Sequence, residues 1–326
     1  MAIRPALSAA VSLLIISTLL AVPARAAALS VWVQSAAERA FSSTVRPSGA
    51  PSSVALWAAR GESEAAQILV RSDTPLTGVQ VTAGALSGPS GAVIPASAVT
   101  VRREYNHPRI SKVGAHQSPP DGGTAYYDAL VENTPQTLAA NLTLPYHYSV
   151  RVPASQAPGT YTGTATVRSG AGDAVVNVAV TVYGVTIPPA DRSTFKMNNW
   201  FTSAGWDYNG TVRAIPAQYG VQMFDANWWR VIENIAANHA RHRNNVIFAD
   251  FQALLIPDTT VDAAGDYTFG WATFDRFVQT FVDAGAMQYI YTPHLLEGLP
   301  NDVVKLDMIK KVNGVVQRVL ADPDTA

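Results

Sequence analysis

The sequence Val175-Val176-Asn177-Val178-Ala179-Val180-Thr181-Val182-Tyr183 decides the class of the first half of this chain. Every second residue from Val176 to Val182 is valine, so four valines would share one face of a β-strand. Shorter runs of the same kind precede it, separated by Gly, Pro, Ser and Asp: Leu29–Gln34, Val54–Ala58, Ala65–Arg71, Val79–Thr82, Val99–Arg102, Tyr146–Val152 and Gly159–Val167. Strands without intervening helices predict a β-sandwich, which we place at residues 27–190.

One segment of this half indicates a particular kind of sandwich. The run Leu144–Pro153 reads as a strand, Pro158-Gly159 as a turn that forces reversal, and Gly159–Val167 as the return strand. This form is typical of an immunoglobulin-like module placed before a catalytic domain. A plain spacer is the alternative reading.

Between Arg102 and Asn141 the alternation fails, and we expect a long irregular loop. Aromatic and polar side chains gather in it: Tyr105, Asn106, His107, Pro108, Arg109, His116, Tyr126, Tyr127, Asp128 and Glu132. Long loops often carry function, and aromatic rings with polar tips suit contact with a sugar. Packing against a neighbouring domain is the other explanation.

After Pro188-Pro189 the period changes to that of a βα domain. Strands are predicted at 194–201, 245–248 and 287–292, with a helix capped by Asp225 and a second helix from about Trp271 to Gly285. Strand, helix, strand, helix and strand predict a parallel sheet and the first part of a (β/α)8 barrel, residues 191–326. Asn313-Gly314 predicts a hairpin after the third strand.

The N-terminus predicts export. Arg4, an apolar run from Val11 to Leu20 and the small-residue sequence Ala24-Arg25-Ala26 form a signal peptide, residues 1–26, cleaved after Ala26. The run is shorter than the ~20 residues of a spanning helix, and no second one occurs, so we expect a secreted or extracytoplasmic protein without an integral membrane segment.

Charge, composition and motifs argue against a nucleic-acid partner, a cofactor and a metal site. When Arg4 and Arg25 leave with the signal, the 23 basic residues fall to 21 against 24 acidic ones, a formal charge of −3, which predicts no nucleic-acid partner. The chain has no cysteine, phosphate loop, dinucleotide fingerprint or nucleophile elbow, so no cofactor is expected. His239 and His242 sit beside Arg241 and Arg243 in a cationic helix end, so no metal site is expected either.

Chemistry in a barrel collects at the carboxyl ends of its strands. Three side chains near these ends are the candidate sugar contacts: Trp200 by stacking, Asp250 and His294 by hydrogen bonds to hydroxyls. Alternatively, Trp200 belongs to the core and the other two are ordinary loop polar residues.

Short motifs along most of the mature chain resemble glycoside hydrolase family 123, whose founding activity is exo-β-N-acetylgalactosaminidase. They are Gly61-Glu62-Ser63-Glu64-Ala65-Ala66-Gln67, Tyr126-Tyr127-Asp128-Ala129-Leu130, Val152-Pro153, Pro158-Gly159-Thr160-Tyr161-Thr162-Gly163, Asn198-Asn199-Trp200, Tyr267-Thr268-Phe269, Phe274-Asp275-Arg276-Phe277 and Pro293-His294-Leu295. The resemblance implies a carbohydrate substrate of the β-N-acetylhexosaminide type. It also implies substrate-assisted catalysis, with an adjacent Asp-Glu pair after a later barrel strand.

No Asp-Glu dipeptide occurs in the 326 residues, so no catalytic residue is assigned. The last residues, Asp322-Pro323-Asp324-Thr325-Ala326, read as a helix start, and we expect a truncated barrel. Two functions stay open: a secreted glycoside hydrolase-like protein that is inactive as this fragment, and a non-catalytic exported carbohydrate-binding or adhesion protein.

Overall fold

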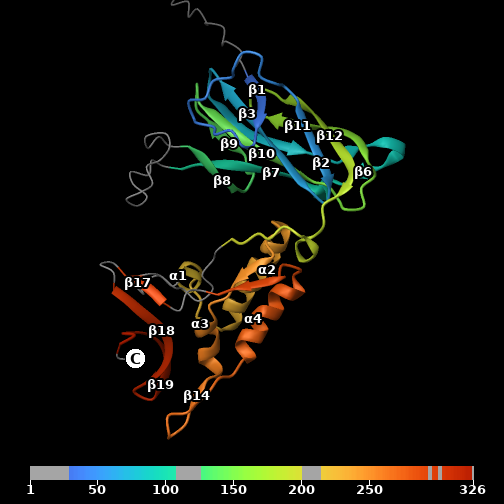
Figure 1. Ribbon diagram of the computed structural model, residues 1–326. Helices are drawn as coiled ribbons and strands as arrows, with labels where there is room; N and C mark the ends of the chain where they lie inside the picture. Colours follow the sequence, from blue (N-terminus) through green and yellow to red (C-terminus); the bar gives the residue numbers. More distant parts are fainter. Residues whose placement is uncertain (1–28, 108–125, 200–213, 293–295, 300–302, 325–326) are drawn as a thin grey trace, which may run out of the picture. The chain divides into compact units, whose positions relative to one another are not determined.

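The computed structural model describes residues 29–107, 126–199, 214–292, 296–299 and 303–324 (Figure 1). These residues are mostly β with a few helices. The chain divides into two compact units. The first comprises Met1–Trp57, Glu64–Val150 and Gly159–Thr181, and the second comprises Ala58–Ser63, Arg151–Pro158 and Val182–Ala326.

The first unit contains a five-stranded sheet. Its strands follow the order β1 (Leu29–Ser35), β3 (Ser63–Ser72), β10 (Thr143–Arg151), β7 (Val99–Asn106) and β8 (Tyr127–Val131). The pairs β1–β3, β10–β7 and β7–β8 are antiparallel. Strand β1 therefore forms one edge of this sheet and β8 the other.

A seven-stranded sheet completes the β-rich part. Its main path is β2 (Val54–Arg60), β12 (Ala174–Thr186), β11 (Gly159–Arg168), β4 (Leu76–Ala83) and β9 (Gln136–Leu138), with β5 (Leu86–Ser87) paired to β11 and β6 (Val93–Ile94) paired to β5. The four alternating valines of β12 are all at most 2% exposed, as their spacing predicted. Strand β2 lies at one end of this path and β9 at the other.

The two sheets pack against each other through their apolar faces. Tyr146 of β10 is fully buried, and its hydroxyl donates to the carbonyl of Val79 on β4 at 2.8 Å, which ties one sheet to the other. Tyr148 and Val150, two and four residues further along β10, are fully buried as well. Every second residue of β10 thus faces the core, as the alternation in the sequence predicts.

All eight predicted strands of this half are confirmed, with ends that differ by a few residues. The expected irregular loop between Arg102 and Asn141 was wrong in part, because β7 continues to Asn106 and β8 and β9 follow. Strand β8 lies at a sheet edge and pairs with β7 through a register shift between Glu104 and Asn106. Residues 128–130 are exposed, so β8 shows no alternation of apolar and polar residues.

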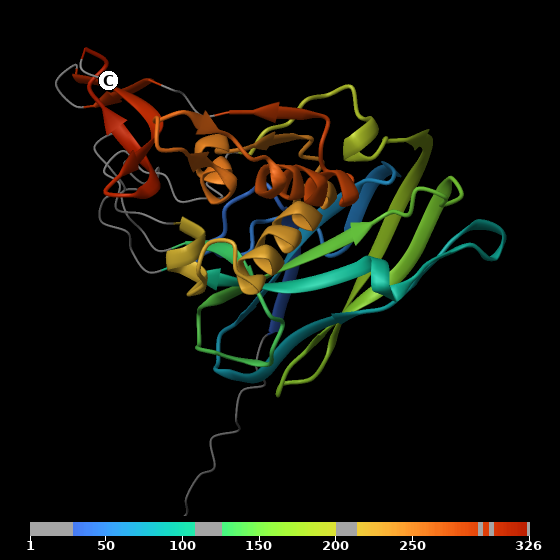
Figure 2. The ribbon, with the colours of Figure 1, turned by 90° about the horizontal axis from the view of Figure 1, so that it is seen from below.

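In the second unit, two short parallel strands lie against helices. Strands β13 (Val246–Phe248) and β16 (Tyr289–Tyr291) pair in parallel. Helix α2 (Ala226–Arg241) lies beside α4 (Ala272–Asp283), as Figures 1 and 2 show. Ile232, Ile247, Phe277 and Phe281 meet in one core and are all fully buried. Each contributes about 1.5–3 kcal/mol to stability relative to exposure.

The predicted helix ends are confirmed. The Asp225 carboxylate accepts the backbone N–H of Trp228 at 2.6 Å and caps α2. Gly285, which follows the C-cap residue Ala284 of α4, has φ +70°, a left-handed conformation that glycine adopts without strain.

The strand predicted at 194–201 was wrong for residues 194–199, which form no regular strand. Residues 200 and 201 lie outside the described residues. Met197 O accepts the N–H groups of both Asn245 and Val246 at 3.1 Å. This one carbonyl stands where a strand would form a series of backbone hydrogen bonds to β13. The buried Asn245 amide donates to Ala190 O and Phe195 O at 3.1 and 2.9 Å and holds this segment in place.

The hairpin predicted at Asn313-Gly314 is confirmed. Both residues have positive φ, 51° and 81°, which a tight turn between twisted strands requires. The hairpin joins β18 (Val303–Val312) to β19 (Val315–Ala321), and β17 (Leu296–Leu299) completes this antiparallel sheet. The remaining short elements are α1 (Ala214–Tyr219), α3 (Phe251–Leu255), β14 (Thr260–Val261), β15 (Tyr267–Thr268) and 3-10 turns at Pro89–Gly91, Ala96–Ala98, Ala190–Arg192 and Ile256–Asp258.

Candidate functional site

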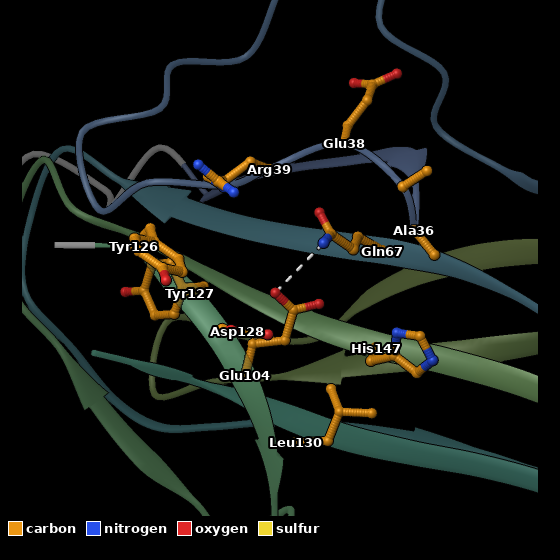
Figure 3. Close-up of a pocket in the computed structure, with 11 residues that line it drawn as sticks. Ala36, Glu38, Arg39, Gln67, Glu104, Tyr126, Tyr127, Asp128, Leu130 and His147 are labelled. Carbon is orange, nitrogen blue, oxygen red and sulfur yellow. Dashed lines mark hydrogen bonds between the residues drawn. The ribbon is translucent and has the colours of Figure 1, made fainter. Parts of the chain in front are cut away.

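A cavity of about 410 Å³ lies on the outer face of the five-stranded sheet (Figure 3). Side chains from β3, β7, β8 and β10 and from the segment after β1 border it. The lining is Ala36, Ala37, Glu38, Arg39, Gln67, Glu104, Tyr126, Tyr127, Asp128, Leu130 and His147. All of them belong to the first unit.

Strand alternation and register bring these residues to one face. Tyr146 points into the core, so its neighbour His147 points away from it. Leu130 of β8 stands directly opposite Glu104 of β7. Gln67 of β3 stands opposite Gln34 of β1, whose amide donates to the Gln67 amide oxygen at 2.7 Å.

Glu104 is the most unusual group in the cavity. It is only 3% exposed, and the Gln67 amide donates to its carboxyl at 3.3 Å. Burial raises the pKa of Glu104 from 4.5 to about 7, the Gln67 hydrogen bond opposes this rise, and the negative charge of Asp128 adds to it. Near neutral pH the carboxyl is therefore protonated in part of the molecules, and it can both donate to and accept from a ligand hydroxyl.

Two tyrosines form one side of the cavity. The Arg39 guanidinium lies 4.6 Å from the centre of the Tyr126 ring, a cation–π contact. The Tyr127 hydroxyl donates to Thr143 O at 2.7 Å, and burial raises the pKa of Tyr127 to about 12, so this phenol is neutral. Burial also lowers the pKa of His147, which favours a neutral imidazole at neutral pH.

The cavity thus combines carboxyl, amide and imidazole groups with aromatic rings. Carboxyl and amide groups hydrogen-bond to hydroxyls, and an aromatic ring packs against an apolar ring face. Within the described residues, no three His, Asp or Glu side chains are placed to hold a metal ion. The arrangement is suited to a neutral polyhydroxylated ligand.

The predicted aromatic cluster contributes Tyr126, Tyr127 and Asp128 to the lining. Pro108, Arg109 and His116 lie outside the described residues. Sequence reasoning missed Glu104, Gln67 and His147. A polar Gln67 among the apolar residues of the predicted strand Ala65–Arg71 is a signal that could have drawn attention to this face.

Of the three residues predicted at barrel strand ends, Trp200 and His294 lie outside the described residues. Asp250 follows β13 as expected and is 3% exposed. One carboxylate oxygen accepts from Ala253 N at 3.3 Å and caps α3, and the other accepts from Arg318 at 2.7 Å. Contact between Asp250 and a sugar stays a prediction.

Within the described residues, no helix has the length and apolar character needed to cross a membrane.

The comparisons with known proteins agree with the resemblance read from the motifs. Residues 41–169 match the model of the glycoside hydrolase 123 N-terminal domain. No curated protein matches the sequence.

Among solved structures, a family 123 glycoside hydrolase from Clostridium perfringens, described in work on glycolipid glycan hydrolysis, matches with a TM-score of 0.66 at 11% identity. The match covers 90% of this chain and 53% of that chain, so this chain spans about half the length of its structural relative.

Two other matches are much weaker. The CooA pilin subunit from enterotoxigenic Escherichia coli has a TM-score of 0.26 at 13% identity and covers 48% of this chain and 99% of its own. The CupB6 tip adhesin from Pseudomonas aeruginosa has a TM-score of 0.21 at 11% identity and covers 40% of this chain and 42% of its own. Scores this low carry no argument. Residues 41–169 are therefore a glycoside hydrolase 123 N-terminal domain, and the fold of the chain is similar to that of a family 123 glycoside hydrolase.

Proposed function

We propose that this protein is an exported carbohydrate-binding relative of family 123 whose ligands are glycans ending in a β-N-acetylhexosamine. The observation that carries the proposal is the match of residues 41–169 to the family's N-terminal domain, because most of the cavity lining lies within that range. Glycolipid glycans, the subject of the work on the Clostridium perfringens enzyme, are the natural class to examine first.

The chemistry of the cavity supports a sugar as its ligand. Glu104 and Gln67 offer paired hydrogen-bonding groups at its floor, and Asp128 and His147 add further acceptors. A volume of about 410 Å³ is within the range of about 300–1,000 Å³ that small-ligand sites occupy.

The proposed architecture is an immunoglobulin-like β-sandwich, residues 27–190, followed by the opening elements of a (β/α)8 barrel, residues 191–326. The parallel pair β13 and β16 with helices α2 and α4 supports the barrel part, since parallel strands need helical crossovers. The N-terminal sequence supports export, with cleavage after Ala26.

Binding without hydrolysis is proposed for these 326 residues. The family resemblance implies an adjacent Asp-Glu pair, and the sequence contains none.

The purified mature chain should be tested on an array of glycans and, in parallel, on aryl β-N-acetylhexosaminides. Saturable binding to glycans with a terminal β-N-acetylhexosamine and no turnover above a buffer blank are expected. Failure to bind any glycan would overturn the proposed function. Turnover that a single substitution in this chain abolishes would overturn the non-hydrolytic part.

A further inference from the structure

A second cavity of about 680 Å³ lies in the first unit, beside β1 and β2, which are edge strands of the two sheets. Residues of β1, β2 and β3 and the loop Pro47–Pro51 line it. Glu38 borders this cavity and also the first one. The two cavities therefore adjoin along one residue.

Trp57 presents an exposed ring in the second cavity. Val54, Leu56 and Ala58 of β2 face the core, so alternation turns Trp57 outward, where it is 58% exposed. Single exposed apolar residues are common, but an indole that lines a cavity offers a large rigid surface for ligand contact.

Hydrogen bonds hold the wall of the second cavity in place. Val33 N donates to Pro51 O at 2.8 Å, and Ala50 N donates to Pro47 O at 3.2 Å. The Arg46 guanidinium donates to Ala50 O at 3.2 Å. Behind the wall, Trp32 is fully buried in a small apolar cluster with Ala50 packed against it. The cavity is thus largely formed before any ligand binds.

A chain of hydrogen bonds connects the two cavities. The Gln34 side chain, which lines the second cavity, donates to Gln67 at 2.7 Å, and Gln67 donates to Glu104 in the first cavity at 3.3 Å. Figure 3 shows Gln67 directed toward Glu104 across the sheet face. Hydrogen-bonded amide and carboxyl groups therefore link the lining of the second cavity to the lining of the first.

We infer that the two cavities form one extended surface that binds an oligosaccharide of at least two sugar units. One sugar occupies the cavity of Glu104 and Tyr126, and a following sugar packs its apolar face on Trp57. This inference takes only its ligand class from the proposed function. The chain of hydrogen bonds from Gln34 through Gln67 to Glu104, with Tyr126 lining one cavity and Trp57 lining the other, supports a ligand made of successive sugar rings.

A peptide strand added to the sheet edge fits this place less well. Strand addition uses free backbone groups of an edge strand. On β1, the N–H of Val33 already donates to Pro51 O, so the loop occupies the edge at this point. Side chains rather than backbone groups are the recognition elements that the surface offers.

The test uses the mature chain and β-linked N-acetylhexosamine glycans of one to four units, chosen as the best binders on the array, with affinities measured by calorimetry. We expect affinity to rise at least about tenfold from one unit to three. Trp57→Ala should remove most of that gain and leave binding of the single unit within about twofold. Ala55→Arg, which places a long side chain in the second cavity, should act in the same way.

Tyr183→Ala is the matched control, because Tyr183 is 50% exposed on β12 and lines neither cavity. It should leave every affinity unchanged. If glycans bind but affinity depends neither on length nor on Trp57, the extended surface is overturned while the proposed function stands. If no glycan binds, both fail.

Discussion

Asp250 and Arg318 form an ion pair although they are 68 residues apart: the Arg318 Nη1 atom lies 2.7 Å from Asp250 Oδ2. The Asp250 side chain is 4% exposed and that of Arg318 is 19% exposed. Asp250 caps α3 after a parallel strand, and Arg318 lies on β19 of the antiparallel hairpin. The pair therefore fastens the hairpin to the carboxyl end of β13.

Removal of the Asp250 carboxylate should destabilise the second unit. Asp250→Ala leaves Arg318 without this partner and α3 without its cap, and we expect a loss of about 3–5 kcal/mol in the free energy of unfolding. Asp250→Asn keeps a capping oxygen and should cost clearly less. Urea unfolding measures both. Equal stability of the alanine variant and the natural protein would show that the pair contributes nothing, and would strengthen the predicted sugar contact of Asp250.

Two tyrosines on the same strand provide a test of the contact between the sheets. Tyr146→Phe removes the hydroxyl that donates to Val79 O and should cost about 1–2 kcal/mol. Tyr148→Phe is the matched control, because the buried Tyr148 hydroxyl has no hydrogen-bond partner within the described residues. Its removal should be neutral or slightly stabilising. Equal losses for both variants in urea unfolding would contradict the role given to the Tyr146 hydroxyl.

Glu104 should make stability depend on pH. Its folded pKa of about 7 lies above the ordinary value of 4.5, so between these values the folded protein holds a proton that the unfolded chain has lost. The free energy of unfolding therefore falls as pH rises through this window.

Glu104→Gln removes this dependence and retains an acceptor for Gln67. Between about pH 5 and pH 8, the free energy of unfolding of the variant should rise by on the order of 2 kcal/mol relative to that of the natural protein. The whole pKa shift would correspond to a larger change, but Glu104 borders a cavity open to water, which weakens the effect. Parallel slopes of stability against pH for the two proteins would refute an elevated pKa.

The cap of α2 gives a smaller, local effect. Asp225→Ala leaves the N–H of Trp228 without its acceptor and should cost about 1 kcal/mol. Asp225→Ser, which also caps helices well, should restore most of the loss. Thermal unfolding of the three proteins compares them, and a serine variant as unstable as the alanine variant would argue against capping as the cause.

Much of the fold could be predicted because the signals are local. The valine alternation of β12, the Asp225 cap and the Asn313-Gly314 turn each depend on a few neighbouring residues whose backbone preferences are strong. Strand β8 and the irregular segment 194–199 escaped prediction for the opposite reason. Strand β8 pairs with β7 at a sheet edge, and segment 194–199 is held through Met197 O. In both cases contacts with residues distant in the sequence determine the backbone conformation, and the local sequence shows no periodic pattern of apolar residues.

The candidate site depends on tertiary structure in the same way. By itself the sequence determined that the chain is β-rich before Pro188, has a βα pattern after it, and includes an aromatic cluster that reaches Tyr126 and Asp128. Only tertiary structure decided that Glu104, Gln67 and His147, each on a different strand, share one sheet face. The order of strands in a sheet depends on how segments far apart in the sequence bury their apolar faces against each other. The sequence around a polar residue on the outward face does not show which strand will lie beside it.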